Sequence, residues 1–358
     1  MQINTLSLKN FRNHKKITIS FKPHLTAVIG KNTSGKTNLL EALTLLSYGK
    51  SGRGAADLDL VEKGKESAFI AGEFKRKENF QLEVRLFINP QTKRLQKKYL
   101  RNNLSTTQQN FAGNLLIVNF SPDDLRIIAD SPGTRRAFLN LALTQVDPKY
   151  RKAQSTYELV IRSRNAILEK IKNGMGRREE LFYWDKLAIE NGNYLTKKRE
   201  ELVKFINSVR VGLAPALGRL RESPLHLHVV YDRSEISPDR LSQYAEAEIS
   251  ATSTLVGPHR DDLQFFDKSR NLKIFGSRGE QRLAVLFLKL RELEYVKEIS
   301  GEKPVLLLDD IFSELDETNR KLALNLIQDH QTILTTADEK DLEYLGDFNF
   351  QKIYLGQL

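Results

Sequence analysis

Hydrophobic positions near the start of the chain alternate with polar ones, and this spacing predicts β-strands. Apolar residues alternate with polar ones over 17–21, and residues 25–29 form a short apolar run that ends at Gly30. Leucines at helical spacing over 37–47 then predict a helix that follows a glycine-rich turn. Further strands are expected at residues 69–74, 80–88 and 115–120.

The middle of the chain has the longer period of helices. Apolar side chains recur every three or four residues over 150–171, and a second helix between 184 and 209 should pack back on the first as a hairpin. This stretch is too short for an extended coiled coil. After it, a helix is expected at residues 279–298 and strands at residues 225–231, 252–256, 304–308, 332–336 and 348–355.

Composition narrows the possible classes of protein. The 358 residues are 40% hydrophobic and 28% charged, as in ordinary globular proteins, and the formal charge of +11 favours a polyanionic partner. Ribosomal and membrane-surface proteins share this basic balance. Cysteine is absent, which excludes disulfides and cysteine-based zinc sites and fits a cytoplasmic protein. No export signal is visible, and no apolar run approaches the roughly 18 residues that span a bilayer.

A phosphate-binding motif follows the apolar run at 25–29. Residues 30–37 match G-x-x-x-x-G-K-[ST] between a predicted buried strand and a predicted helix. Backbone N–H groups of such a loop surround phosphates, Lys36 reaches the β- and γ-phosphates, and Thr37 ligates Mg²⁺. The predicted nucleotide-binding set is Gly30, Lys31, Asn32, Thr33, Ser34, Gly35, Lys36, Thr37 and Asn38.

A second segment ends in two carboxylates. The apolar strand at 304–308 runs into Asp309 and Asp310. Taken alone, this is how many ordinary strands end. Together with the P-loop it predicts a Walker B segment, in which Asp309 holds Mg²⁺ through its water shell and Asp310 polarises the attacking water.

The turn at residues 275–282 opens the late helix, and its Ser277 lies 32 residues before Asp309. It could be only a helix cap, with Ser277 as the capping residue and Glu280 completing a capping box. Its position before the Walker B strand favours the signature turn of ABC-type ATPases. In those proteins the serine and the helix N-terminus face the γ-phosphate of nucleotide bound by the other subunit.

The separation of Lys36 from Ser277 by 241 residues, with a helical stretch between them, resembles the SMC-like branch of the ABC ATPases. Four further segments resemble the RecF family within that branch: residues 8–14, 121–125 with 131–139, 257–263 and 309–316. The resemblance implies an α/β fold, an ABC-type P-loop ATPase head of mixed sheet and flanking helices with an inserted helical arm. The implied domains are residues 1–130 (head, with Walker A), 131–222 (arm) and 223–358 (head, with signature and Walker B).

The resemblance also implies a function. It points to a weak DNA-dependent ATPase that uses ATP and Mg²⁺. ATP binding would drive the formation of a homodimer, and slow hydrolysis would release that dimer. Its partners would be DNA, both duplex and junctions with single strands, and RecR and RecO, with which it helps to load RecA in gap repair and replication restart. It assigns catalysis to Lys36, Ser277 and Asp310, Mg²⁺ to Thr37 and Asp309, the dimer seam to Asp316, and a phosphate approach to Arg12.

Several positions depart from the ABC pattern. Glu280 replaces a usual glutamine, and Arg278 replaces a usual glycine or glutamine. Thr335-Thr336-Ala337 stands at the late strand where transporters carry a histidine switch. A Q-loop cannot be assigned, because no glutamine stands at a suitable position near Asn119. Slow turnover would fit these departures. A DNA-binding scaffold that holds ATP with hardly any hydrolysis is therefore the alternative, whereas a transporter ATPase should show the histidine and a short helical insert.

Two basic regions, one within residues 93–101 and one within residues 177–199, are candidates for sequence-independent contacts with DNA phosphates. The first region is favoured because Tyr99 and a strand-like context could form a flat surface. His226 and His228 share one strand face, which is more typical of a solvated face than of a metal site. The two regions are Lys93, Arg94, Lys97, Lys98 and Arg101, and Arg177, Arg178, Lys197, Lys198 and Arg199.

Overall fold

The computed structural model describes residues 1–51, 57–208, 226–312, 320, 324, 326–346 and 348–356. Contacts between residues divide the chain into two compact units. Among the described residues, unit 1 holds 1–124 and 286–356, and unit 2 holds 125–208 and 226–285. Residues 226–285, which the sequence placed in the head, therefore cluster with the helical arm.

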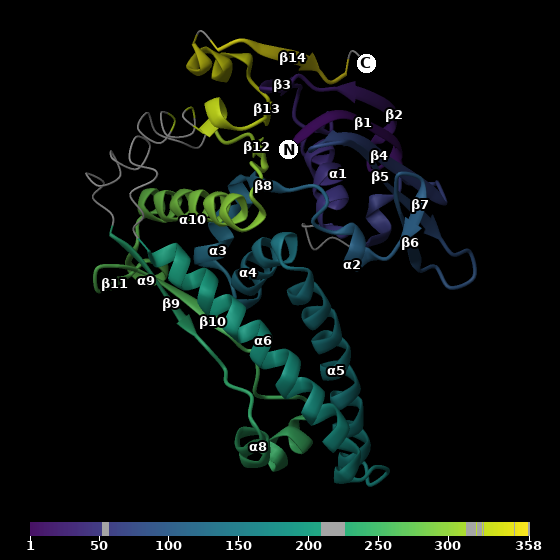
Figure 1. Ribbon diagram of the computed structural model, residues 1–358, viewed down its shortest axis with the longest axis vertical. Coiled ribbons are helices and arrows are strands. Elements are labelled where there is room, and N and C mark those ends of the chain that lie inside the picture. Colours follow the sequence, from purple (N-terminus) through teal and green to yellow (C-terminus); the bar gives the residue numbers. More distant parts are fainter. Residues whose placement is uncertain are drawn as a thin grey trace. The chain divides into compact units, whose positions relative to one another are not determined.

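Unit 1 contains a five-stranded, fully parallel sheet with the strand order β14-β3-β13-β12-β8 (Figure 1). Its three central strands are buried at every position, which explains why their sequences are continuous apolar runs without alternation. The strand bounds are Leu25–Ile29 (β3), Ile117–Phe120 (β8), Val305–Asp309 (β12), Thr332–Thr336 (β13) and Phe350–Tyr354 (β14).

Unit 1 also contains a six-stranded antiparallel sheet with the order β2-β1-β4-β5-β6-β7. Its strands alternate between buried and more exposed positions, as expected when one face covers a core. The strand bounds are Gln2–Phe11 (β1), His14–Ser20 (β2), Ser67–Lys75 (β4), Asn79–Ile88 (β5), Leu95–Arg101 (β6) and Leu104–Thr106 (β7).

Two long helices complete the core of unit 1. Helix α1 (Lys36–Tyr48) contacts strands of both sheets, so its surface is buried almost all round. Helix α10 (Arg278–Ser300) packs Leu286, Leu290 and Leu293 on the other face of the parallel sheet. The parallel sheet is thus covered on both faces, as βαβ connections require.

Unit 2 is built on two long helices, α5 (Pro148–Lys172) and α6 (Phe182–Asn207), which pack together as the predicted hairpin (Figure 1). Helices α4 (Pro132–Val146) and α8 (Pro238–Ala251) pack on them. A small antiparallel sheet has the order β11-β10-β9, with the bounds Leu227–Asp232 (β9), Asp262–Asp267 (β10) and Arg270–Asn271 (β11). The short helices are Asp57–Leu60, Gln108–Phe111, Pro122–Leu125, Arg126–Ala129, Arg178–Leu181, Leu272–Phe275 and Glu339–Leu345.

The strand expected at residues 252–256 was wrong. These residues form a loop that leaves α8 through Thr252, whose φ of 51° is left-handed. The helix before them was missed because its sequence is mostly polar, although Ser237 caps it and Pro238 stands at its first turn. Within the described residues, no helix is long and apolar enough to cross a membrane.

Two segments that carried the resemblance meet inside unit 2. Arg135, from segment 131–139, forms an ion pair with Asp262, from segment 257–263, at 2.5 Å between Nε and Oδ1. Arg136 donates to the carbonyl oxygen of Asp261 at 2.7 Å, and burial lowers the pKa of its guanidinium. These contacts between the two segments therefore stabilise the packing of α4 against β10.

Candidate nucleotide-binding site

The predicted chemical groups converge at one edge of the parallel sheet. Because the strands are parallel, their carboxyl ends meet at the same edge, where ligands bind in folds of this kind. The P-loop follows β3, the Asp309-Asp310 pair ends β12, and Thr335 and Thr336 end β13, which lies between them. The site is thus assembled from three neighbouring strand ends.

Backbone geometry explains the glycines of the P-loop. Gly35 has a φ of 99°, and a Cβ there would lie 2.6 Å from Asn13 Oδ1 and from the His14 ring. A Cβ on Gly30 would lie 2.5 Å from Ser34 Oγ. Only glycine fits a left-handed residue under such close neighbours. The loop is therefore packed too tightly at these two positions for any side chain larger than that of glycine.

Asn13 and His14, at the turn between β1 and β2, support the P-loop from outside. Asn13 Nδ2 donates to the Thr33 carbonyl oxygen at 3.1 Å, and Nε2 of His14 donates to the Gly35 carbonyl oxygen at 3.0 Å. Burial lowers the pKa of His14, so the ring is neutral at neutral pH and the hydrogen bond fixes its tautomer. Sequence reasoning missed both residues, although they stand within the segment 8–14.

Lys36 and Ser34 show that the loop has polar groups to offer a ligand. Lys36 Nζ donates to the Gly30 carbonyl oxygen at 2.7 Å and to the Lys31 carbonyl oxygen at 3.3 Å. Ser34 Oγ is buried and has no hydrogen-bond partner among the described residues. An orphaned hydroxyl beside a buried ammonium fits a loop that surrounds an anion.

Asp309 is held by two threonine hydroxyls. Thr335 Oγ1 donates to its Oδ1 at 2.6 Å, and Thr37 Oγ1 donates to the same oxygen at 3.2 Å. Asp309 is buried at the end of β12. The hydroxyl of Thr37 and the carboxylate of Asp309 are the hard oxygen donors that Mg²⁺ prefers, so the residues present fit that ion. Thr335, which stands where transporter ATPases carry the histidine switch, thus orients this carboxylate.

Asp310 has a strained backbone and a perturbed carboxyl group. Its φ is 52°, which is unusual for a residue with a side chain, and its N–H donates to the Thr335 carbonyl oxygen at 3.1 Å. Burial raises the pKa of its carboxyl group, although the Lys36 ammonium and the Ala337 N–H oppose that effect. A carboxyl group with a raised pKa at a strained position is typical of a functional site.

Arg12 and Asn38 lie beside the loop in contact with the protein's own residues. The Arg12 guanidinium forms a bidentate pair with Glu41, at 2.9 and 2.8 Å, and also donates to the Asp59 carbonyl oxygen at 3.0 Å. Asn38 Nδ2 donates to Asn13 Oδ1 at 2.9 Å. The predicted phosphate approach of Arg12 stays a prediction.

Asn119 lies on β8, near the position where ABC ATPases carry the Q-loop glutamine. Its buried Oδ1 has no hydrogen-bond partner within the described part of the chain.

The signature turn belongs to unit 2, and its serine is exposed. Ser277 Oγ accepts from the Glu280 N–H at 3.3 Å, and Glu280 Oε2 accepts from the Ser277 N–H at 2.7 Å. The capping box is thereby confirmed, and hydrogen bonds from Arg270 and Ser277 lower the pKa of Glu280. A signature role for Ser277 stays a prediction, and the segment 313–316, with Asp316, lies outside the described residues.

The structure removes two residues from the predicted DNA surfaces. Arg199 is buried in unit 2, where its guanidinium pairs with Asp261 at 2.7 Å and donates to the Pro258 carbonyl oxygen at 2.6 Å. Tyr99 is also buried, and its hydroxyl donates to the Gly49 carbonyl oxygen at 2.7 Å. Both were expected at a surface, and that expectation was wrong.

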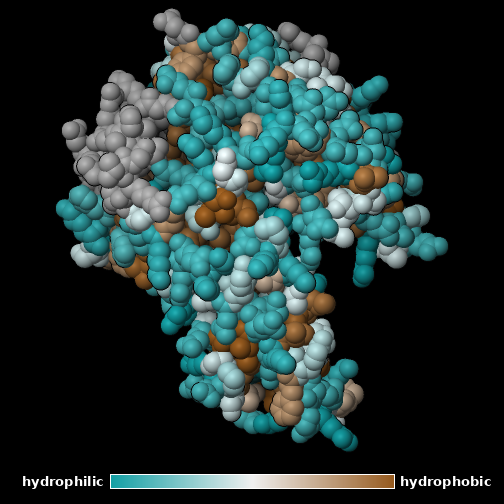
Figure 2. Space-filling model, viewed as in Figure 1, coloured by the Kyte–Doolittle hydropathy of each residue, from teal (hydrophilic) through white to brown (hydrophobic). Residues whose placement is uncertain are grey.

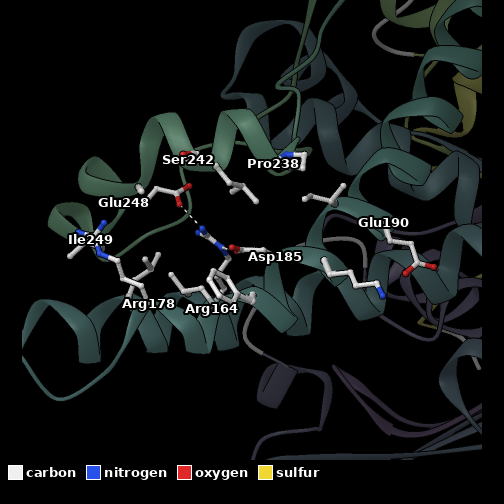
Figure 3. Close-up of a pocket in the computed structure, with 15 residues that line it drawn as sticks. Arg164, Arg178, Asp185, Glu190, Pro238, Ser242, Glu248 and Ile249 are labelled. Atoms are coloured by element: carbon white, nitrogen blue, oxygen red, sulfur yellow. Dashed lines mark hydrogen bonds and ion pairs between the residues drawn. The ribbon is translucent and has the colours of Figure 1, made fainter.

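A pocket of about 780 Å³ lies between α5, α6 and α8 in unit 2 (Figure 3). Its floor is Arg164, which is fully buried and pairs with Asp185 and with Glu248, each at 2.7 Å. The charges on the floor therefore satisfy one another. Arg164 is a structural residue of the arm.

The fold and the site together define an ABC-type P-loop ATPase head with an inserted helical arm. The model of the RecF/RecN/SMC N terminal domain family matches residues 2–350. The DNA replication and repair protein RecF of Bacillus cereus (strain AH820) is 34% identical over 360 residues, which cover 96% of this chain and 94% of that protein. The same figures hold for that of Bacillus anthracis (strain A0248). The chain belongs to the RecF family.

Two solved structures are similar over nearly the whole chain. The structure of the recombination mediator protein RecF-ATPrS in the RecFOR pathway superposes with a TM-score of 0.86 at 30% identity, covering 99% of this chain and 96% of that one. Its RecF-ATP counterpart gives a TM-score of 0.85 at the same identity and coverage.

Proposed function

We propose that this chain binds ATP and Mg²⁺ at the P-loop and acts as a recombination mediator, using slow ATP hydrolysis as a switch. The observation that carries the proposal is the arrangement of Lys36 and Thr37 after β3 and of Asp309 and Asp310 at the end of β12, where Thr37 donates to Asp309. The RecF structures with ATP and ATPrS lend it support, because they resemble this chain over 99% of its length.

In the proposed mechanism, the Lys36 ammonium leaves the carbonyl oxygens of its own loop and binds the β- and γ-phosphates. Thr37 and Asp309 would hold Mg²⁺, which neutralises charge on the phosphate oxygens when it is bound. Thr335 keeps the Asp309 carboxylate in place. Asp310 accepts a proton from the attacking water, and its raised pKa makes it a better base than an ordinary aspartate.

The switch in this proposal is an ATP-dependent homodimer. Ser277 is exposed immediately before the 23-residue helix α10, whose N-terminus carries partial positive charge. We expect it to face the γ-phosphate of nucleotide held by a second copy. Because Glu280 is engaged by Ser277 and Arg270, the turn is fixed before any partner arrives.

DNA and recombination proteins are the proposed partners. The basic balance of +11 favours a polyanion, and the RecF relatives are DNA replication and repair proteins. We expect the chain to bind duplex DNA and junctions with single strands, and to act with RecR and RecO to help load RecA in the cytoplasm. Hydrolysis would then be weak and DNA-dependent.

The test is the mass of the full chain in solution with and without ATP and Mg²⁺. The wild type should dimerise with ATP, the Lys36→Met variant should stay monomeric, and Lys50→Met, which removes an exposed lysine just after α1, should behave like the wild type. A wild type that stays monomeric with ATP and ignores DNA would refute the proposal.

A second candidate is a scaffold that holds ATP without turnover, which the unusual Glu280 and the missing histidine favour. Phosphate release from the wild type, with Asp310→Asn as the inactive control, separates the two. Release that equals that of Asp310→Asn, in a protein that still dimerises, would identify the scaffold.

A further inference from the structure

The outer face of the six-stranded sheet carries four cations in line across the strands, with Phe69 between the second and the third. Pairing in the sheet sets Lys16 opposite Lys9, Lys9 opposite Phe69, Phe69 opposite Arg85, and Arg85 opposite Lys98. Residues directly opposite each other point to the same face. On β1, β4 and β5 the adjacent residues Leu8, Ile70 and Val84 are buried, so this face is the one away from the core. We call Lys16, Lys9, Arg85 and Lys98 the basic row.

Charge repulsion within the basic row destabilises the sheet. Like charges directly opposite each other on neighbouring strands are destabilising, and the row contains two such pairs, Lys16 with Lys9 and Arg85 with Lys98. Arg85 has a compensating carboxylate, because it pairs with Glu83. Lys9, Lys16 and Lys98 are exposed and form no ion pair within the described ranges. Such a row is more easily explained by an external anion than by folding.

We propose that the basic row binds the phosphate backbone of duplex DNA. The row crosses five strands, and four intervals of about 4.8 Å give a length of roughly 19 Å. At a rise of about 3.4 Å per base pair, this length spans the phosphates of five to six base pairs on one strand. The inference rests on the proposed association with DNA and names the surface responsible for it.

The side chains between the cations favour a duplex over a single strand. Proteins that bind single strands stack bases on exposed aromatic rings along the path of the backbone. Phe69, the aromatic residue between Lys9 and Arg85, is only partly exposed, and the more exposed Phe87 lies two residues beyond Arg85 on β5. Most of the face drawn in Figure 2 is hydrophilic, with apolar side chains gathered in a few patches.

The experiment compares the salt dependence of DNA binding. In the row variant Lys9, Lys16 and Lys98 are all changed to Gln, and Arg85 is kept because it holds Glu83. A control variant changes three exposed lysines on the arm helices to Gln, which removes the same charge: Lys149, Lys152 and Lys204. Binding to a short duplex of random sequence and to a single strand of equal length is measured from low to high salt.

The slope of log K against log salt should fall by about 3 in the row variant, since each lost phosphate contact reduces it by about 0.9. The control should keep the slope of the wild type. ATP affinity should be unchanged in both variants, which shows that unit 1 is folded. For the single strand, the row variant should lose less than it loses for the duplex.

Three results would overturn the inference. One is a row variant that keeps the slope of the wild type on duplex. Another is an equal loss in the row variant and the control, because total charge would then explain binding. The third is a greater loss on the single strand, which would make the face a stacking platform. A wild type that binds no DNA at all would instead contradict the proposed function, so the two failures are distinguishable.

Discussion

His259 should make unit 2 sensitive to mild acid. Its ring is buried between two partners: Nε2 donates to the Thr254 carbonyl oxygen at 2.9 Å, and Nδ1 accepts from the Tyr157 hydroxyl at 2.8 Å. A second proton on the ring, at Nδ1, would face the hydroxyl of Tyr157, which donates its own hydrogen to that nitrogen. Burial lowers the pKa of His259 from 6.5 to about 4, and the positive charges of Arg260 and Arg136 act in the same direction.

The size of the effect follows from the two pKa values. Because the folded value is depressed, the unfolded chain holds the proton more tightly, and protonation favours unfolding. The stabilising contribution is complete above the unfolded value of 6.5 and is lost as the pH falls toward about 4. A difference of about 2.5 in pKa corresponds to about 3 kcal/mol in full, of which about 2 kcal/mol is lost by about pH 5.

Urea unfolding followed by tryptophan fluorescence measures this loss. The chain has one tryptophan, Trp184, and it lies in α6 of the same unit as His259. His259→Gln keeps a donor near Thr254 but cannot titrate. Between about pH 7.5 and about pH 5, the unfolding free energy of the wild type should fall by about 2 kcal/mol more than that of the variant.

The control is His24→Gln, which removes an exposed histidine of unit 1 and should follow the wild type. Buried histidines in unit 1 titrate equally in all three proteins, so they cancel in the comparison. Parallel pH profiles for the wild type and His259→Gln would refute the reasoning, because the ring would then gain no protonation energy on unfolding.

Three further predictions concern the site and the arm. Gly35→Ala should weaken ATP binding by about tenfold or more in a direct binding assay, because a φ of 99° disfavours any side chain; unchanged affinity would contradict the geometry. Thr335→Val should lower ATP turnover by about tenfold, since the buried Asp309 carboxylate loses its 2.6 Å hydrogen bond; equal turnover would show that Thr37 alone suffices. Arg135→Met should cost about 3 kcal/mol in urea unfolding, and adding Asp262→Leu should restore more than half; no rescue would mean that the ion pair is not the cause.

The parts of the fold that the sequence predicted correctly are those set by local periodicity. The apolar runs at 25–29, 304–308 and 332–336 are buried strands of the parallel sheet, each within one residue of the predicted bounds. The two long helices of the arm also follow their predicted spacing. Continuous apolar runs between turns identify strands buried on both faces, because such strands have no polar side to show.

For Arg199 the helix was predicted correctly, but the exposure of the side chain was predicted wrongly. It lies four residues after Leu195 and three before Leu202, so helical spacing places all three on one face, and all three are buried. The prediction followed its charge and neglected its position. A buried arginine needs a carboxylate partner, and Asp261, 62 residues away in sequence, supplies it. That partner could not be inferred from local spacing.

The support of the P-loop was equally hidden from local reasoning. Asn13 and His14 contact Thr33 and Gly35, which lie about twenty residues further along the chain, and the contacts exist only because the β1–β2 hairpin folds over the loop. The Walker motifs were recognisable because phosphate chemistry fixes their residues at short spacing. The residues that position them are set by tertiary packing.

The same hairpin links the two proposed binding surfaces. Lys9 on β1 and Lys16 on β2 belong to the basic row, and the turn between them holds the P-loop through Asn13 and His14. An anion that pulls the two lysines together acts on the strands that meet at this turn. If DNA on the row changes the affinity of the P-loop for ATP, linkage requires ATP to change the affinity for DNA by the same factor. A rigid hairpin of two paired strands is a short physical path for such coupling, because the hydrogen bonds at its turn reach the loop directly.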